Sequence, residues 1–70
     1  MKLKGTVRFR DLEAGLWLLE SDDGTLYALA GGDRHLKRDG ASVEIEGEVS
    51  ESPNAHMVGP VLRVRRYSFL

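Results

Sequence analysis

The side chains with the greatest capacity for acid–base catalysis in this chain are two histidines, His35 and His56. His35 follows Asp33 in a short glycine-bounded stretch, and His56 lies between Pro53 and Pro60. Nucleophilic catalysis needs a nucleophile and a base that a third group holds in place, and neither histidine has such a set beside it in the sequence. We therefore interpret both histidines as surface or packing residues and expect the chain not to be an enzyme.

Metal and phosphate sites are not indicated either. The densest acidic group, Asp22 and Asp23 with Asp33, matches neither the spacing of a calcium loop nor that of a zinc site. Aspartates in tight turns commonly serve the turn itself. Gly31 and Gly32 lack the lysine and the longer glycine pattern of a phosphate-binding loop. The sequence therefore predicts no metal site and no cofactor.

Length and composition indicate one small domain over residues 1–70. Hydrophobic residues make up 41% of the chain and cysteine is missing, so neither a disulfide scaffold nor a thiolate site is expected. No apolar run approaches the roughly 18 residues of a membrane span, and residues 1–4 do not lead into a signal-peptide core. We expect a cytoplasmic globular protein without membrane contact. The scarcity of Asn and Gln beside 30% charged residues points toward a thermophilic source.

Three stretches alternate apolar and polar residues with the period of a half-buried strand: residues 3–10, 43–49 and 62–65. The last stretch continues into Arg66, which is an unsuitable core residue. A one-residue bulge near Arg65 and Arg66 resolves this conflict, because it lets Tyr67 and Phe69 turn inward. These three strands are the most strongly indicated elements.

A hairpin is predicted from residues 16–21 and 25–30, joined by Asp22, Asp23 and Gly24. A two-residue turn and a three-residue loop with Gly24 in the left-handed conformation give different registers. We favour the three-residue loop, because it buries the largest side chains together and leaves Glu20 in solvent. In that register Leu19 lies opposite Tyr27 and Trp17 lies opposite Leu29, all four on the inner face.

The stretch from Gly31 to Gly40 is the one candidate helix, with Asp33 as its cap and Leu36 as an apolar plug. The predicted order is strand, two-strand hairpin, short helical turn, strand, loop and strand. This order favours an all-β fold, a small five-stranded oligonucleotide/oligosaccharide-binding (OB)-like barrel with one short helical turn between strands three and four. An SH3-like barrel is the alternative, but its usual long loop after the first strand is missing. Gly5 and Gly47 occupy inward positions where a strand can bend sharply.

Several short motifs resemble those of a group of short, uncharacterised bacterial proteins with an OB-like barrel. The motifs are Gly15-Leu16-Trp17, Asp22-Asp23-Gly24 with Tyr27, Asp39-Gly40 with Val43, and His56-Met57-Val58-Gly59-Pro60. The resemblance spans nearly the whole chain and consists mostly of turn and core residues. It implies a fold, and it transfers no catalytic or ligand-binding residue.

The net charge of −1 conceals a segregated pattern, since residues 1–10 carry four bases and no acid while residues 11–51 carry all eleven acids. In an OB-like barrel the fourth strand lies between the first and the fifth, so Glu44, Glu46 and Glu48 are expected to pair with bases on both sides. The alternative function is single-stranded nucleic-acid binding through the first and fifth strands. The residues that would carry it are Lys4, Arg8, Arg10, Arg63, Arg65 and Tyr67. We disfavour it, because pairing with the glutamates would cancel the field of these bases.

The outer face of the hairpin is more apolar than a solvated face should be. We therefore predict a non-enzymatic interaction module that self-associates, as a homodimer or other homo-oligomer, or binds a protein partner through this face. The partner-binding residues would be Leu16, Leu18, Leu26 and Ala28 as anchors, with Met57 and Val58 at the rim. Two alternatives remain open: the register is wrong, or residues 50–60 fold over this face.

Overall fold

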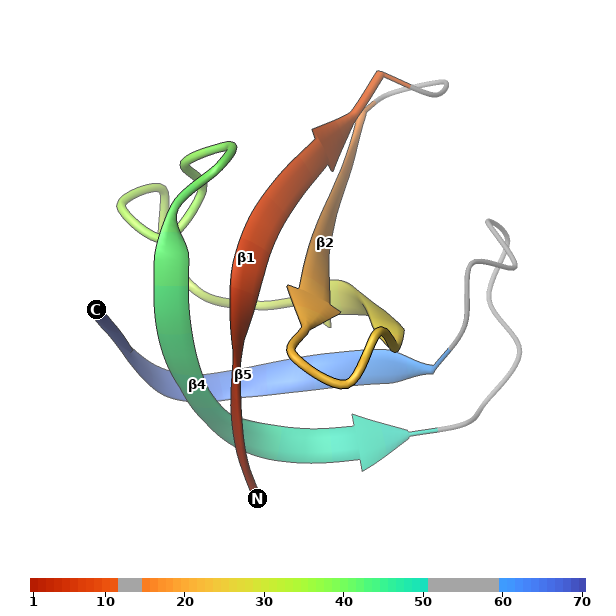
Figure 1. Cartoon of the computed structure of the whole chain (residues 1–70), viewed down its shortest axis with the longest axis vertical. Helices are drawn as coiled ribbons and strands as arrows, with labels where there is room; N and C mark the ends of the chain where they lie inside the picture. Colours follow the sequence, from red (N-terminus) through yellow and green to blue (C-terminus); the bar gives the residue numbers. More distant parts are fainter. Residues whose placement is uncertain (12–14, 51–59) are drawn as a thin grey trace.

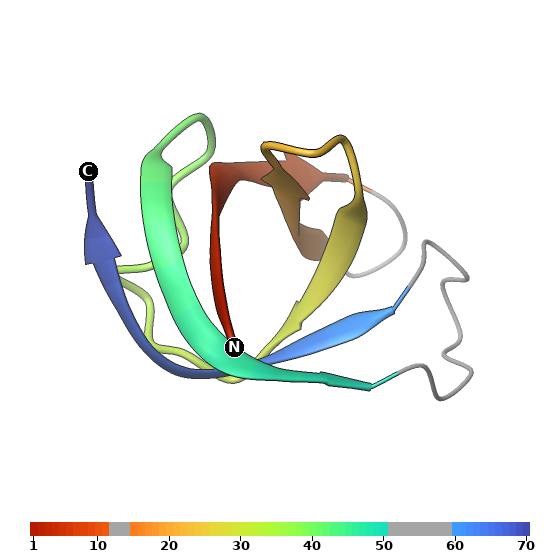
Figure 2. The ribbon, with the colours of Figure 1, turned by 60° about the horizontal axis from the view of Figure 1, so that its bottom comes forward.

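The computed structural model describes residues 1–11, 15–50 and 60–70. These residues form five strands, which are β1 (Lys2–Arg10), β2 (Leu16–Ser21), β3 (Leu26–Ala30), β4 (Ser42–Ser50) and β5 (Val61–Phe69) (Figure 1). The strands close into a barrel in the order β1-β2-β3-β5-β4 (Figure 2). All neighbouring strands are antiparallel except β3 and β5, which are parallel. The predicted all-β, five-stranded barrel is confirmed.

The interior of the barrel is filled by alternate residues of the strands together with one residue from the β3–β4 connection. This core consists of Val7, Leu19, Tyr27, Leu36, Val43, Ile45 and Leu62, each at most 8% exposed. Trp17 and Leu29 are partly buried and pack against the core. The inward positions follow the two-residue period that the sequence shows, so burial of these apolar side chains is what fixes the strand faces.

The hairpin adopts the predicted three-residue register. Leu19 lies opposite Tyr27, and Leu18 lies opposite Ala28. Gly24 has a φ of 89°, a conformation that glycine adopts without the steric cost of a Cβ atom. The amide of Gly24 donates to the carbonyl of Ser21 over 2.9 Å and closes the loop. Because the register is correct, the assignment of residues to the inner and outer faces is correct as well.

A bulge interrupts the pairing of β4 with β5 where the sequence predicts one. Glu46 lies opposite Arg66 and Gly47 lies opposite Val64, so Arg65 is the extra residue of β5. After the bulge, Tyr67 packs against the core as expected. Phe69 follows on the same face but stays 41% exposed, so its predicted inward turn is only partial.

Two inward glycines allow strands to approach closely. A Cβ atom on Gly5 would lie 2.2 Å from the carbonyl oxygen of Glu20, and one on Gly47 would lie 2.1 Å from that of Arg63. Both distances are too short for real contacts, and in each case the obstacle is the backbone of the neighbouring strand. The barrel therefore requires glycine at positions 5 and 47.

The predicted short helix between β3 and β4 is wrong: residues 31–41 form successive turns. The amides of Leu36 and Lys37 donate three residues back, each over 3.2 Å. Gly40 and Ala41 then pair with Val7 on β1, over 2.7 and 2.8 Å. Gly32 and Gly40, on either side of the turns, have φ values of 79° and 89°. These values lie outside the right-handed helical range, so no helix continues through either glycine. Within the described part of the chain, no helix is long and apolar enough to cross a membrane.

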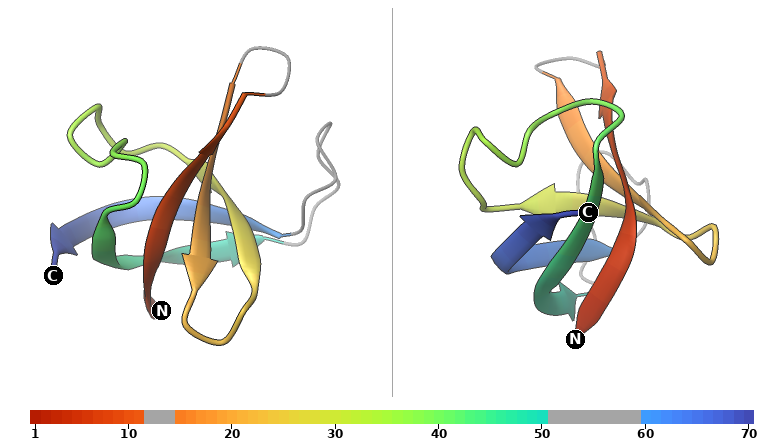
Figure 3. Two further views of the ribbon diagram at one scale, coloured as in Figure 1. Left: turned by 45° about the horizontal axis from the view of Figure 1, so that its top comes forward. Right: turned by 60° about the vertical axis from the view of Figure 1, so that its left-hand side comes forward.

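The predicted roles of individual residues in this connection hold despite the missing helix. Asp33 accepts hydrogen bonds from the amides of His35 and Leu36, over 3.0 and 3.3 Å, and so caps the first turn. Leu36 is fully buried, as expected of a plug. The connection lies on the same side of the barrel as the C-terminal end of β5 (Figure 3).

Candidate interaction surfaces

A second apolar cluster lies on the outside of the barrel, separate from the core. Leu16 and Leu18 of β2 and Ala28 of β3 form it, and Val61 of β5 packs against it. These residues occupy the outward positions of their strands, and Leu26 belongs to the same face. The structure therefore brings together three of the four described residues predicted as partner-binding anchors, while Leu26 lies further along the same face.

The exposure of this face differs from the prediction. Leu16 is 8% exposed, Leu18 is fully buried and Ala28 is 6% exposed, while Leu26 is half-buried. A position on the outer face of a barrel therefore does not mean contact with solvent here. The sequence analysis left open the alternative that another part of the chain covers this face, and the burial of Leu16, Leu18 and Ala28 is what that alternative predicts. Met57 and Val58, the predicted rim residues, lie outside the described residues.

The outer faces of β1, β2, β4 and β5 carry paired charges of opposite sign. Glu46 of β4 accepts from Arg66 over 2.6 Å and lies across the ladder from it. The other ion pairs among the described residues are Lys4–Glu44, Arg8–Glu20 and Arg65–Glu48, at 4.0, 3.6 and 3.6 Å. The predicted placement of the acidic strand between basic ones is confirmed. Exposed pairs of this kind contribute little to stability individually, but they neutralise each other's field.

Four of the six residues predicted for nucleic-acid binding have a side-chain partner within the described part of the chain. Lys4, Arg8 and Arg65 each lie in one of the ion pairs above. Tyr67 donates its hydroxyl hydrogen bond to Asp33. Arg10 and Arg63 make no ion pair with another described residue.

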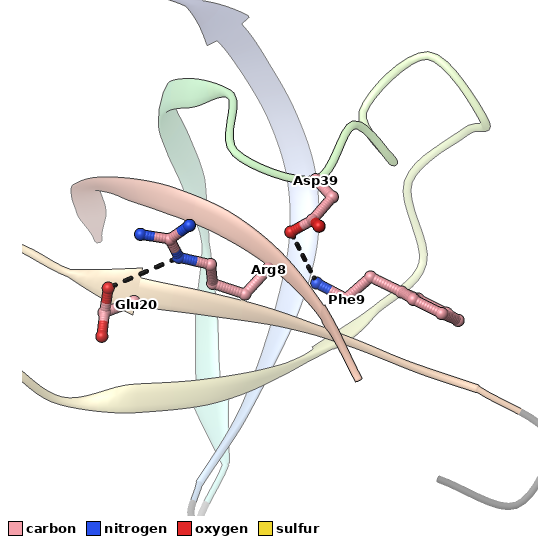
Figure 4. Close-up of polar contacts among 4 residues, drawn as sticks. All are labelled: Arg8, Phe9, Glu20 and Asp39. Atoms are coloured by element: carbon pink, nitrogen blue, oxygen red, sulfur yellow. Dashed lines mark hydrogen bonds and ion pairs between the residues drawn. The ribbon is translucent and has the colours of Figure 1, made fainter. Parts of the chain in front are cut away.

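Three side-chain contacts join the β3–β4 connection to the ends of β1 and β5. The Asp39 carboxylate accepts from the amide of Phe9 over 3.1 Å, next to the Arg8–Glu20 ion pair (Figure 4). The guanidinium of Arg38 lies 5.1 Å from the ring centroid of Phe69, within cation–π range. The third contact is the bond from Tyr67 to Asp33, residues 34 positions apart. Sequence reasoning assigned Asp33 only a local capping role, because periodicity carries no signal for contacts of this separation.

The bond between Tyr67 and Asp33 shifts both acid–base equilibria. The hydrogen bond from the Tyr67 hydroxyl lowers the pKa of Asp33, and the backbone amides of His35 and Leu36 add to the effect. The same bond raises the pKa of Tyr67, because its hydroxyl donates to the carboxylate only while protonated. At the hairpin, the hydroxyl of Ser21 and the amide of Thr25 lower the pKa of Asp23. These carboxylates serve as hydrogen-bond acceptors for turns and strand ends.

The residues considered for catalysis and metal binding lie apart. His35 is exposed on the β3–β4 connection, and His56 lies outside the described residues. Among the residues that the structure describes, no three His, Cys, Asp or Glu side chains are grouped so that they could hold a metal ion.

Comparison with protein families gives a match that covers almost the whole chain. The family described as "Protein of unknown function (DUF5818)" matches residues 5–68. Comparison with curated proteins and comparison with solved structures found no match. The matched range runs from the inward glycine of β1 into the last residues of β5, so it covers β2, β3 and β4 in full and most of β1 and β5. The chain therefore belongs to the DUF5818 family.

Proposed function

We propose that this chain is a non-catalytic interaction module, an OB-like barrel that self-associates through the outer side of β2 and β3. Two features support the OB-like assignment: β4 lies between β1 and β5, and Leu36 enters the core from the connection between β3 and β4. OB barrels commonly use the face of strands two and three for binding.

The observation that carries this proposal is the apolar cluster outside the barrel. Leu18 and Ala28 lie opposite each other on β2 and β3, and Val61 extends the cluster to β5. Leu26 continues this face toward the hairpin loop and is only half-buried. Because the other anchors are already buried within one chain, Leu26 is the anchor that an incoming surface reaches. Covering an apolar side chain that lies beside buried apolar residues lowers the free energy, because apolar surface is removed from water.

Sedimentation velocity on the purified chain tests the proposal. The wild type should self-associate as its concentration rises, and Leu26→Glu should shift the population to the monomer while leaving the β-sheet circular dichroism unchanged. Ser42→Glu, which places the same charge on an exposed position of β4, should associate like the wild type. A Leu26→Glu variant that associates like the wild type, or a wild type that stays monomeric, would exclude this surface. Leu18→Glu does not serve here, since a charge at a fully buried position should unfold the barrel.

Single-stranded nucleic-acid binding is a second candidate, favoured by Arg10 and Arg63, which form no ion pair within the described part of the chain. Binding of mixed-sequence oligonucleotides at low salt, followed by fluorescence anisotropy, should then weaken steeply as salt is added. Arg63→Ala should weaken it further. If no binding is detected at low salt, this candidate is excluded.

A further inference from the structure

One strand edge of the barrel is open. β5 pairs with β4 along its whole length, whereas its pairing with β3 covers only Val61–Arg63. β3 ends at Ala30, so β4 is the one strand that pairs with the later residues of β5 among those described. The β3–β4 connection touches these residues through side chains, Asp33 at Tyr67 and Arg38 at Phe69. In Figure 2 this end of β5, in dark blue, lies at the margin of the barrel beside β4 with no strand beyond it.

The hydrogen-bond pattern identifies which backbone groups point to the open edge. The amide of Leu70 donates to the carbonyl of Ser42 over 2.9 Å, so residue 70 directs its backbone toward β4. Along an antiparallel strand, alternate residues direct their amide and carbonyl groups to opposite edges. Ser68 and Arg66 therefore also face β4, and Tyr67 and Phe69 face away from it. Their backbone amides and carbonyls have no hydrogen-bond partner among the described residues.

The side chains of this edge are complementary to themselves. If two β5 edges pair antiparallel about Ser68, the Ser68 residues of the two copies lie opposite each other. Ser68 has the smallest side chain between Arg66 and Phe69. Tyr67 of each copy then lies opposite Phe69 of the other, and aromatic cross-strand pairs stabilise antiparallel strands. Phe69 is 41% exposed in the single chain and so has surface to bury in this contact.

The charged side chains nearest this edge are already engaged within the chain, and one of them is Arg38, whose guanidinium lies 5.1 Å from the Phe69 ring centroid. Arg66 is already held by Glu46 at 2.6 Å, and Arg65 by Glu48 at 3.6 Å. The bulge at Arg65 also ends the regular ladder on that side, as bulges commonly do at sheet edges. The segment open to pairing is therefore short, from Arg66 to Phe69. One partner strand occupies it completely, which gives a closed two-fold dimer and not a growing sheet.

We propose that the open edge of β5 binds the same edge of a second copy of this chain, forming a continuous β4–β5–β5–β4 sheet. Four backbone hydrogen bonds join the copies, two for each pair of Tyr67 with Phe69. This contact is separate from the β2–β3 surface of the proposed function and shares no residue with it.

Amide hydrogen exchange followed by NMR provides the direct test. Across protein concentrations from about 10 μM to about 1 mM, the range of weak association, the amides of Tyr67 and Phe69 should become protected as the dimer forms. The amide of Arg66, which faces β4, should be protected at every concentration. Fast exchange at Tyr67 and Phe69 throughout would overturn the proposal.

Two variants separate this contact from the β2–β3 surface. Ser68→Lys sets like charges opposite each other in the dimer and should raise the dissociation constant about fivefold, whereas Ser42→Lys, one strand in from the edge, should leave it unchanged. Phe69→Pro removes an edge-facing amide without touching the bonds to β4, and should raise the dissociation constant at least about tenfold. Dissociation caused by Leu26→Glu but by neither edge variant would overturn this inference and support the proposed function. The reverse result would support the edge and exclude the β2–β3 surface.

Discussion

Gly47→Ala should be among the most destabilising small substitutions in the barrel. Gly47 lies on β4 at the register shift, with a Cβ position 2.1 Å from the Arg63 carbonyl oxygen and 3.0 Å from its carbonyl carbon. Real Cβ atoms essentially never come closer than 3.0 Å to such an atom. Arg63 cannot simply retreat, because it lies between Glu48 of β4 and Ala30 of β3. The added methyl group must therefore separate two strands of a closed barrel.

The expected cost is a large part of the stability of the domain. Overpacking of this kind costs about 1–3 kcal/mol, and weakening one or two neighbouring ladder hydrogen bonds adds about 1 kcal/mol each. The sum is about 2–5 kcal/mol. A domain of 70 residues has a free energy of unfolding of about 4–10 kcal/mol. Gly47→Ala should therefore leave a marginally folded or unfolded chain.

Urea denaturation followed by Trp17 fluorescence and by circular dichroism measures this effect. With a slope of about 1 kcal/mol/M for a small domain, the midpoint should fall by about 2 M or more. Gly24→Ala is the matched control: its Cβ position has nothing within 4 Å, and its φ of 89° should cost only about 1–2 kcal/mol. A Gly47→Ala variant no more destabilised than Gly24→Ala would contradict the steric requirement for glycine at position 47.

Three further predictions concern the β3–β4 connection. Leu36→Ala should lower the free energy of unfolding by about 2–5 kcal/mol, because it empties a fully buried site; a urea titration showing less than 1 kcal/mol would contradict the plug role. Asp39→Ala should cost about 1 kcal/mol and speed amide exchange at Phe9, whereas Asp39→Asn, which keeps an acceptor, should retain the protection. The pKa of Asp33 is lowered from 3.8 by the bond from Tyr67, so that stabilisation is complete above pH 3.8 and is lost as the pH falls through the lower folded-state pKa. Thermal melts against pH should therefore show a flatter acid limb for Tyr67→Phe, and an unchanged limb would exclude the bond.

Local patterns in the sequence were sufficient for the strands, the hairpin register and the bulge. The register followed from the cost of burying Glu20 and the gain from burying Trp17, Leu19 and Tyr27 together. The bulge followed from a conflict within β5, where strict alternation would have put Arg66 into the core. In both the register and the bulge, the competing arrangement would bury a charged side chain. Glu20 therefore decides the register, and Arg66 decides the bulge.

The β3–β4 connection was assigned incorrectly because its structure is decided by distant residues. Asp33, Leu36 and Gly40 are all suited to a short helix. The structure instead uses the same residues for contacts with β1 and β5, through Val7 and Tyr67. Two strand-like bonds to β1 and one buried leucine outweigh a single helical turn, which is only marginally stable alone.

The outer face of the hairpin shows that the alternation of residues along a strand does not predict their exposure to solvent. Alternation assigned Leu18 to the outer face correctly, yet Leu18 is fully buried. A strand period states which residues share a face, and only the position of other chain segments decides whether that face meets water. The same distinction applies to β5, where Tyr67 packs inward while its backbone faces an open edge. An outward apolar side chain in this small barrel can be covered by the chain itself, as Leu18 is. The edge-facing amides and carbonyls of Tyr67 and Phe69 have no hydrogen-bond partner among the described residues, so they are the stronger indicator of an interaction surface. For that reason the amide exchange of Tyr67 and Phe69 discriminates between interaction surfaces more sharply than a substitution on the β2–β3 surface such as Leu26→Glu.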